Sequence, residues 1–125
     1  YYADCNLSPA VSRIRDDIAV TQSESDGIIY ARNMNIPENG YMFMGCTGKS
    51  DAFLSRKADF FGRTGNFAHP KVLDYSTWKN SGDKGTADCM VIKTSIEVKP
   101  HCSEKLVLVL GGAESVQAIR VLKNK

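Results

Sequence analysis

The chain has 125 residues, 42% of them hydrophobic, which suits one domain that buries roughly two thirds of the surface exposed when it is unfolded. Its formal charge of +2 comes from 16 basic and 14 acidic residues spread along the sequence, a pattern that disfavours a nucleic-acid-binding role. The longest apolar runs, Tyr41 to Met44 and Leu106 to Leu110, are far shorter than the roughly 20 residues of a membrane-spanning helix. We therefore expect a soluble protein with no nucleic-acid or membrane partner.

Turn signals divide the first half of the chain into short strands. Apolar and β-branched residues predict strands over 18–21, 28–32 and 41–44. A Ser-Asp-Gly turn at 25–27 and a Pro- and Gly-containing turn at 36–40 separate them. The middle of the chain, 52–88, is rich in Gly, Asn, Asp and Ser but also in aromatic residues, and predicts long loops held in place by those rings rather than disorder.

The last third of the chain changes its hydrophobic period twice. Residues 90–98 alternate apolar and polar, which predicts a half-buried antiparallel strand. The run from Leu106 to Leu110 is apolar at both parities, which predicts a central strand covered on both faces. Apolar residues then recur at helical spacing, which predicts a helix over 113–123. The fold class that follows is a mainly β, antiparallel sandwich with a C-terminal helix, in a single domain over 1–125.

Four cysteines lie far apart in the sequence, at Cys5, Cys46, Cys89 and Cys102. No C-x-x-C pair is present, so a zinc site is disfavoured. We expect reduced cysteines in or near the core of a cytoplasmic protein, with a disulfide as the alternative.

Three kinds of chemistry are disfavoured by the motifs. A phosphate-binding loop ending at Ser50 would need glycine at position 43, where the chain has Phe43, so 45–50 is interpreted as a turn after a strand. Neither His69 nor His101 has a partner at a diagnostic spacing. Four aspartates could serve glycoside chemistry, but no spacing pairs them and solvent-facing or turn-capping roles are expected: Asp59, Asp74, Asp83 and Asp88. We expect no catalytic residue, metal or cofactor in this chain.

The most informative segment runs from Leu54 to Leu73. Its glycines permit tight turns, and its arginines carry planar groups that can bind hydroxyls, carboxylates or phosphate. In order, it contains Arg56, Phe60, Gly62, Arg63 and Pro70. This order resembles the signature of the N-terminal β-supersandwich domain of glycoside hydrolase family 94, formerly glycosyltransferase family 36. That family includes cellobiose, chitobiose and β-1,2-oligoglucan phosphorylases and relatives in cyclic β-1,2-glucan synthases.

Other stretches resemble the same family in the same order along the chain. They are Ser8 to Arg13, Ile28 to Arg32, Asp88 with Cys89, Ile96 to Pro100, and Val109 to Gly111 before the predicted helix. The chain departs from the family pattern at two turns. The proline expected beside Asp88 is absent, and His101 replaces the glycine expected after Pro100.

The resemblance implies a galactose-mutarotase-like sandwich that belongs to a larger enzyme. In such enzymes the catalytic aspartate and the phosphate site lie in a C-terminal (α/α)6 barrel, so this chain is expected to be a non-catalytic fragment of an inverting phosphorylase that cleaves β-glucosides with inorganic phosphate. The expected partners are that barrel, a second copy in a homodimer, and a β-glucan or oligosaccharide. Arg56, Arg63 and Trp78 are the expected substrate-adjacent residues, because arginines can hydrogen-bond hydroxyls and a sugar can stack on indole.

Three alternatives stay open from the sequence. In the first, Arg63 holds a loop in place and Trp78 fills the core, and neither residue contacts a substrate. The chain can also be a free-standing carbohydrate-binding module, or an unrelated β-sandwich interaction domain. The sugar and its linkage have no signal in these residues.

Overall fold

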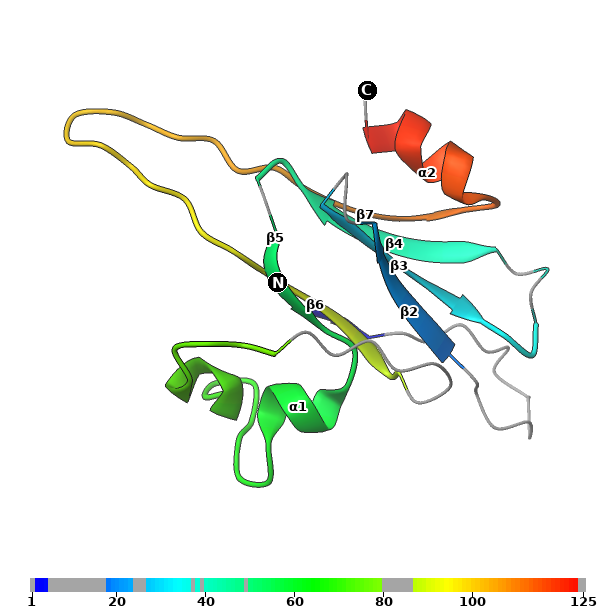
Figure 1. Cartoon of the computed structure of the whole chain (residues 1–125), viewed down its shortest axis with the longest axis horizontal. Helices are drawn as coiled ribbons and strands as arrows, with labels where there is room; N and C mark the ends of the chain where they lie inside the picture. Colours follow the sequence, from blue (N-terminus) through cyan, green and yellow to red (C-terminus); the bar gives the residue numbers. More distant parts are fainter. Residues whose placement is uncertain are drawn as a thin grey trace.

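The computed structural model describes residues 2–4, 18–23, 27–36, 38, 40–48, 50–79 and 87–123. Within these residues, seven strands form two antiparallel sheets (Figure 1). A three-stranded sheet has the order β1-β6-β5 and a four-stranded sheet the order β2-β3-β4-β7. The strands are β1 (Tyr2–Asp4), β2 (Ile18–Ser23), β3 (Ile28–Asn33), β4 (Tyr41–Cys46), β5 (Ser50–Leu54), β6 (Cys89–Thr94) and β7 (Leu108–Ala113). The predicted mainly β sandwich with a C-terminal helix is confirmed.

The two sheets enclose the main hydrophobic core. Strands β3 and β4 contribute Ile29, Ala31, Met44 and Cys46, and the opposite sheet contributes Phe53, Met90 and Ile92. All of these side chains are buried because the apolar face of each sheet lies against the other sheet.

Helices cover the two outer faces of the sandwich. The C-terminal helix α2 (Val116–Lys123) places Ile119 against Ile28 and Phe43 of the four-stranded sheet. On the other outer face, helix α1 (Lys57–Phe61) and the 3-10 helix η2 (Lys71–Asp74) bury Phe60 and Val72 against the three-stranded sheet. Figure 1 shows α1 and α2 on opposite sides of the molecule.

Local signals predicted the first strands and the last helix. The strands predicted at 18–21, 28–32 and 41–44 correspond to β2, β3 and β4. The turn predicted at 36–40 ends at Gly40. Its φ of 74° favours glycine, and the Cβ of any other residue there would lie only 2.6 Å from the Ala113 carbonyl oxygen. Both features require glycine. The predicted helix begins three residues later than expected, at Val116, because Ala113 ends β7 and Ser115 Oγ accepts a hydrogen bond from the Ala118 N–H.

The burial predicted for the last two strands was wrong, and the two assignments are exchanged. Strand β6 is central in its sheet and covered on both faces: Met90 and Ile92 lie in the core between the sheets, and Cys89 and Val91 lie under α1 and η2. It ends at Thr94, and Ile96 is exposed. Strand β7 is an edge strand, with Leu110 60% exposed.

The prediction of long loops over 52–88 was wrong where β5, α1 and η2 form. Their periods could not be recognised because each element has five residues or fewer. Aromatic rings do hold this region: Tyr2, Phe60, Phe61 and Phe67 pack ring against ring with centroids 4.8–5.6 Å apart. Asp83 lies outside the described residues.

No disulfide links the cysteines that the structure describes. Cys46 and Cys89 are buried and Cys102 is exposed, while Cys5 lies outside the described residues. Among the described helices, none is long and apolar enough to cross a membrane.

Isoleucine-to-alanine substitutions can measure the difference in burial between the two halves of the predicted 90–98 strand. Ile92 and Ile96 share a parity, but Ile92 is 1% exposed and Ile96 is 52% exposed. We expect Ile92→Ala to lower the free energy of unfolding by about 2–5 kcal/mol because it leaves a cavity in the core. Ile96→Ala, the matched control, should change it by less than about 0.5 kcal/mol. Equal losses in urea denaturation would contradict the observed end of β6.

Candidate functional site

The segment that carries the family signature is built around helix α1. The Arg56 carbonyl accepts hydrogen bonds from the Asp59 and Phe60 N–H groups at 3.1 and 3.2 Å, which starts the helix. Asp88, just before β6, accepts a hydrogen bond from the Lys57 N–H at 2.6 Å through Oδ1. This carboxylate therefore caps the helix across 31 residues of sequence and fastens it to the sheet.

Two glycines shape the loop that follows α1. Gly62 has a φ of 67°, in the left-handed region that favours glycine. A Cβ on Gly65 would lie 2.0 Å from the Phe61 carbonyl oxygen and 2.8 Å from the Lys71 nitrogen. The loop can therefore close onto both the end of α1 and the start of η2 only with glycine at position 65.

A small charged cluster holds the start of η2. Lys71 Nζ lies 2.6 Å from Asp74 Oδ2, and His69 Nε2 lies 3.3 Å from Asp74 Oδ1. The hydrogen bond from Lys71 and its positive charge, with a smaller contribution from His69, hold the pKa of Asp74 below its ordinary value of 3.8. The same hydrogen bond and the negative charge of Asp74 raise the pKa of Lys71.

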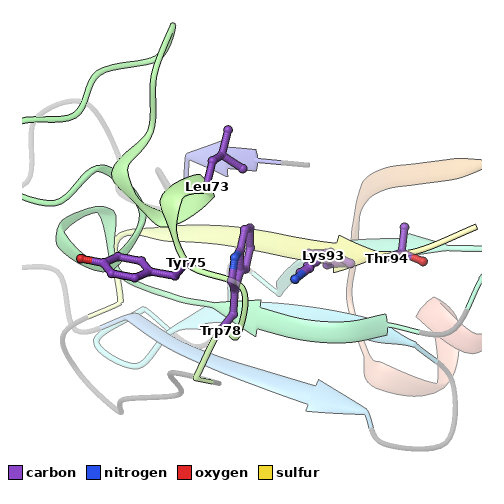
Figure 2. Close-up of a pocket in the computed structure, with 6 residues that line it drawn as sticks. Leu73, Tyr75, Trp78, Lys93 and Thr94 are labelled. Carbon is purple, nitrogen blue, oxygen red and sulfur yellow. The ribbon is translucent and has the colours of Figure 1, made fainter.

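Immediately after η2, the chain passes over the outer face of the three-stranded sheet and places two aromatic rings there. Trp78 is half-buried and packs beside Leu54, Val72 and Val91, while Tyr75 is 57% exposed. Figure 2 shows the Trp78 ring standing between Tyr75 and Lys93. Lys93 Nζ lies 5.3 Å from the centre of the indole, a cation–π arrangement, and 3.4 Å from the Ser76 carbonyl oxygen.

Two shallow depressions meet at Trp78. The first, of about 340 Å³, lies toward β6 and is lined by Leu73, Tyr75, Trp78, Ile92, Lys93 and Thr94. The second, of about 350 Å³, lies toward α1 and is lined by Leu54, Asp59, Val72, Tyr75, Thr77, Trp78 and Lys79. Both share the Trp78 and Tyr75 side chains, so the rings form a common wall with polar groups on either side.

The three residues singled out from the sequence as substrate-adjacent do not all line the depressions. Trp78 lines both depressions, whereas neither wall includes Arg56 or Arg63, which are both exposed near α1. The substrate-adjacent role of all three residues stays a prediction. Sequence reasoning missed Tyr75, Thr77, Lys79 and Lys93 as neighbours of Trp78. Their signal would have been the clustering of aromatic and polar residues over 75–79, but Lys93 reaches the site from a different element.

The remaining candidates lie apart from one another or serve the fold. Asp88 caps α1, Asp74 pairs with Lys71, and Asp59 lines the second depression. Among the residues that the structure describes, no group of three His, Cys, Asp or Glu side chains could hold a metal ion. The site is therefore an aromatic surface with hydrogen-bonding neighbours.

Comparison with known families matches residues 10–125 to the family described as Glycosyl hydrolase 94, supersandwich domain. The chain belongs to this family. No curated protein is similar enough to it to count as a match. The match places the α1 segment, Trp78 and both depressions within this GH94 supersandwich domain.

The turn at His101 shows how the domain accommodates one departure from the family pattern. The Cys102 N–H donates to the Lys99 carbonyl at 3.0 Å, and His101 has a φ of 60°. Proline followed by a residue with positive φ is the arrangement of a type II turn, in which glycine is favoured. The turn is thus kept with His101 at the position where the family resemblance predicts glycine.

We expect Gly65→Ala to destabilise the domain by about 1–3 kcal/mol, because the added methyl group overlaps backbone atoms that cannot move independently. Thr64→Ala is the control, since Thr64 is exposed in the same loop. Thermal unfolding followed by circular dichroism measures both, and equal melting temperatures for the two variants would show that the loop does not close on position 65.

The lowered pKa of Asp74 predicts a pH-dependent contribution to stability. A carboxyl whose pKa is depressed in the folded state stabilises that state above its unfolded pKa, and the contribution is lost as pH falls through the folded value. Asp74→Asn should therefore melt slightly lower than the parent chain at pH 7, and the difference should shrink as the pH falls below 3.8 and vanish below the lowered pKa of the folded state. Glu104→Gln, at another exposed carboxylate, serves as the control. A difference between parent and Asp74→Asn that is constant with pH would argue against the ion pair.

Proposed function

We propose that this GH94 supersandwich domain is the non-catalytic, carbohydrate-associated domain of an inverting glycoside phosphorylase. In this proposal the parent enzyme cleaves a β-glucoside with inorganic phosphate, and the domain supports an (α/α)6 catalytic barrel and a homodimer. The family match over 10–125 is the observation that carries the proposal. Release of a sugar 1-phosphate by the enzyme that contains this domain, and no release by this chain alone, is the outcome that supports the division of roles.

The chemistry around Trp78 supports contact with a sugar. The C–H face of a pyranose packs on an indole ring, and its hydroxyls need donors and acceptors at the rim. The second depression supplies both kinds of group, since it combines Trp78 and Tyr75 with Asp59, Thr77 and Lys79. An oligosaccharide of neutral sugars fits this mixture better than an anion does, because a carboxylate and an ammonium share the rim.

The position of Lys93 indicates which side of the ring takes the sugar. Its ammonium already occupies one face of Trp78 at 5.3 Å and is held there by the Ser76 carbonyl. A sugar stacked on that face would have to displace the cation–π contact, which contributes about 0.5–1 kcal/mol at an exposed site. We therefore place the sugar in the second depression, between Trp78 and α1.

The thiols support a cytoplasmic location. Cys46, on β4, is buried in the core between the two sheets, Cys89 is buried on the outer face of the three-stranded sheet, and Cys102 is exposed; no disulfide links these three described residues. Cysteines that do not form disulfides are typical of proteins in a reducing compartment.

Trp78 is the only tryptophan of the chain, so its fluorescence reports directly on the proposed site. We expect cellobiose or a short β-1,2-glucan to change that fluorescence with a Kd on the order of 1 mM, about −4 kcal/mol. Tyr75→Ala should weaken the binding measured by calorimetry at least several-fold, because Tyr75 lines the same wall and is largely exposed.

The matched control for Tyr75→Ala is Phe67→Ala, which removes an aromatic ring that is 73% exposed and lines neither depression. Its affinity for sugar should equal that of the parent chain. Glycerol at equal concentration corrects for solvent effects on the fluorescence. If neither fluorescence nor calorimetry detects a sugar at roughly ten times the expected Kd, the domain has no sugar site of its own and acts as a scaffold.

A further inference from the structure

The first depression, toward β6, differs from the second in its charge. Its wall contains one cation, Lys93, and no carboxylate, whereas the wall of the second depression contains both Asp59 and Lys79. The hydroxyl-bearing Thr94 also lines the first depression, and its other lining residues are apolar or aromatic. The first depression therefore offers a ligand one positive charge and no negative charge.

The Lys93 ammonium is held by neutral groups only. It lies 5.3 Å from the centre of the Trp78 ring and 3.4 Å from the Ser76 carbonyl oxygen, and its side chain is half-buried. Among the residues that the structure describes, none forms an ion pair with Lys93. An ammonium has three donors, and a charge that is partly withdrawn from water is stabilised by an opposite charge. Lys93 therefore has both the charge and the donors to bind an anion.

The same lysine decides which ligands can reach the β6 side of the indole. Figure 2 shows the Lys93 side chain directed at Trp78. A neutral sugar on this face would break the cation–π contact and give the ammonium no new partner. A phosphate group would instead form an ion pair and charge-assisted hydrogen bonds with the ammonium as it draws the ammonium off the ring. The uncovered indole face can then pack against the C–H face of the attached sugar.

We propose that the first depression is a binding site for a phosphorylated monosaccharide. Lys93 pairs with the phosphate, and the wall formed by Trp78 and Tyr75 packs against the sugar. The volume of about 340 Å³ falls within the range of small-molecule sites, roughly 300–1,000 Å³. Lys93 is thereby a specificity-determining residue, which excludes neutral sugars from this side of the ring and admits phosphorylated ones. The site is argued from charge and geometry, and only the choice of a sugar 1-phosphate as the probe rests on the proposed function.

Calorimetry with glucose 1-phosphate at low ionic strength tests the site. We expect the parent chain to bind with a Kd on the order of 1 mM, and the affinity to fall as added salt screens the ion pair. Lys93→Met keeps an apolar stem without the charge and should weaken binding by about ten-fold or more, as the loss of a charge-assisted hydrogen bond does. Lys93→Arg should retain binding. Lys105→Met is the matched control, because it removes the same charge from an exposed lysine that lines neither depression, and it should bind like the parent chain.

Inorganic phosphate and glucose, titrated separately, test the two halves of the ligand. Each should bind the parent chain several-fold more weakly than glucose 1-phosphate does, and in Lys93→Met the phosphorylated sugar should lose its advantage over glucose. Equal affinities for inorganic phosphate and glucose 1-phosphate would show that the sugar makes no contact, and this result would overturn the proposal. Unchanged affinity in Lys93→Met would also overturn it.

The two proposed sites can fail separately. No binding of glucose 1-phosphate at roughly ten times the expected Kd would overturn the phosphorylated-sugar site, even if cellobiose binds. Binding of glucose 1-phosphate that depends on Lys93, in a chain that does not bind cellobiose or a β-1,2-glucan, would support the first depression and contradict the sugar site proposed in the second.

Discussion

Strand β6 excludes water from both of its faces, and the arrangement of the rest of the domain follows from this. On one face Met90 and Ile92 meet the side chains of β3 and β4, and on the other Cys89 and Val91 meet α1, η2 and Trp78. Hydrogen bonding to β1 and β5 on either side completes the enclosure. Because an uncovered face would expose a row of apolar side chains, the four-stranded sheet and the α1–η2 layer must both be docked for β6 to be stable.

Features that depend on local sequence were predictable, and features that depend on coverage by distant segments were not. Turn residues and runs of apolar or β-branched residues located β2, β3 and β4, and helical periodicity located α2. The burial of β6 and β7 was predicted the wrong way round. The alternation of 90–98 and the apolar run at 106–110 show only which residues are apolar, whereas the order of strands in the sheets decides which strand has neighbours on both sides. Helix α1 was missed because it has only five residues and because its cap, Asp88, lies 31 residues away from the backbone that it binds.

The candidate site shows the same division. Trp78 could be singled out because it is the only tryptophan and indole suits a sugar face. Its neighbours come from η2, the segment after it and β6, so no single window of sequence contains them. Trp78 also packs against Leu54 and Val91, so one side chain takes part in both the hydrophobic layer and the surface wall. This double role favours a rigid site, since an indole that is half-buried cannot change rotamer without disturbing the layer beneath it.

The bond from the Lys57 N–H to Asp88 Oδ1 couples the surface layer to the sheet in a way that hydrogen exchange can follow. The same short stretch carries two further links, because the Asp88 and Cys89 N–H groups both donate to the Ser55 carbonyl, at 2.9 and 3.2 Å. Opening of α1 and fraying of the first residues of β6 are therefore one cooperative event and not two. A ligand that binds only the closed layer would slow amide exchange in β6, although β6 itself lies beneath the surface that the ligand touches.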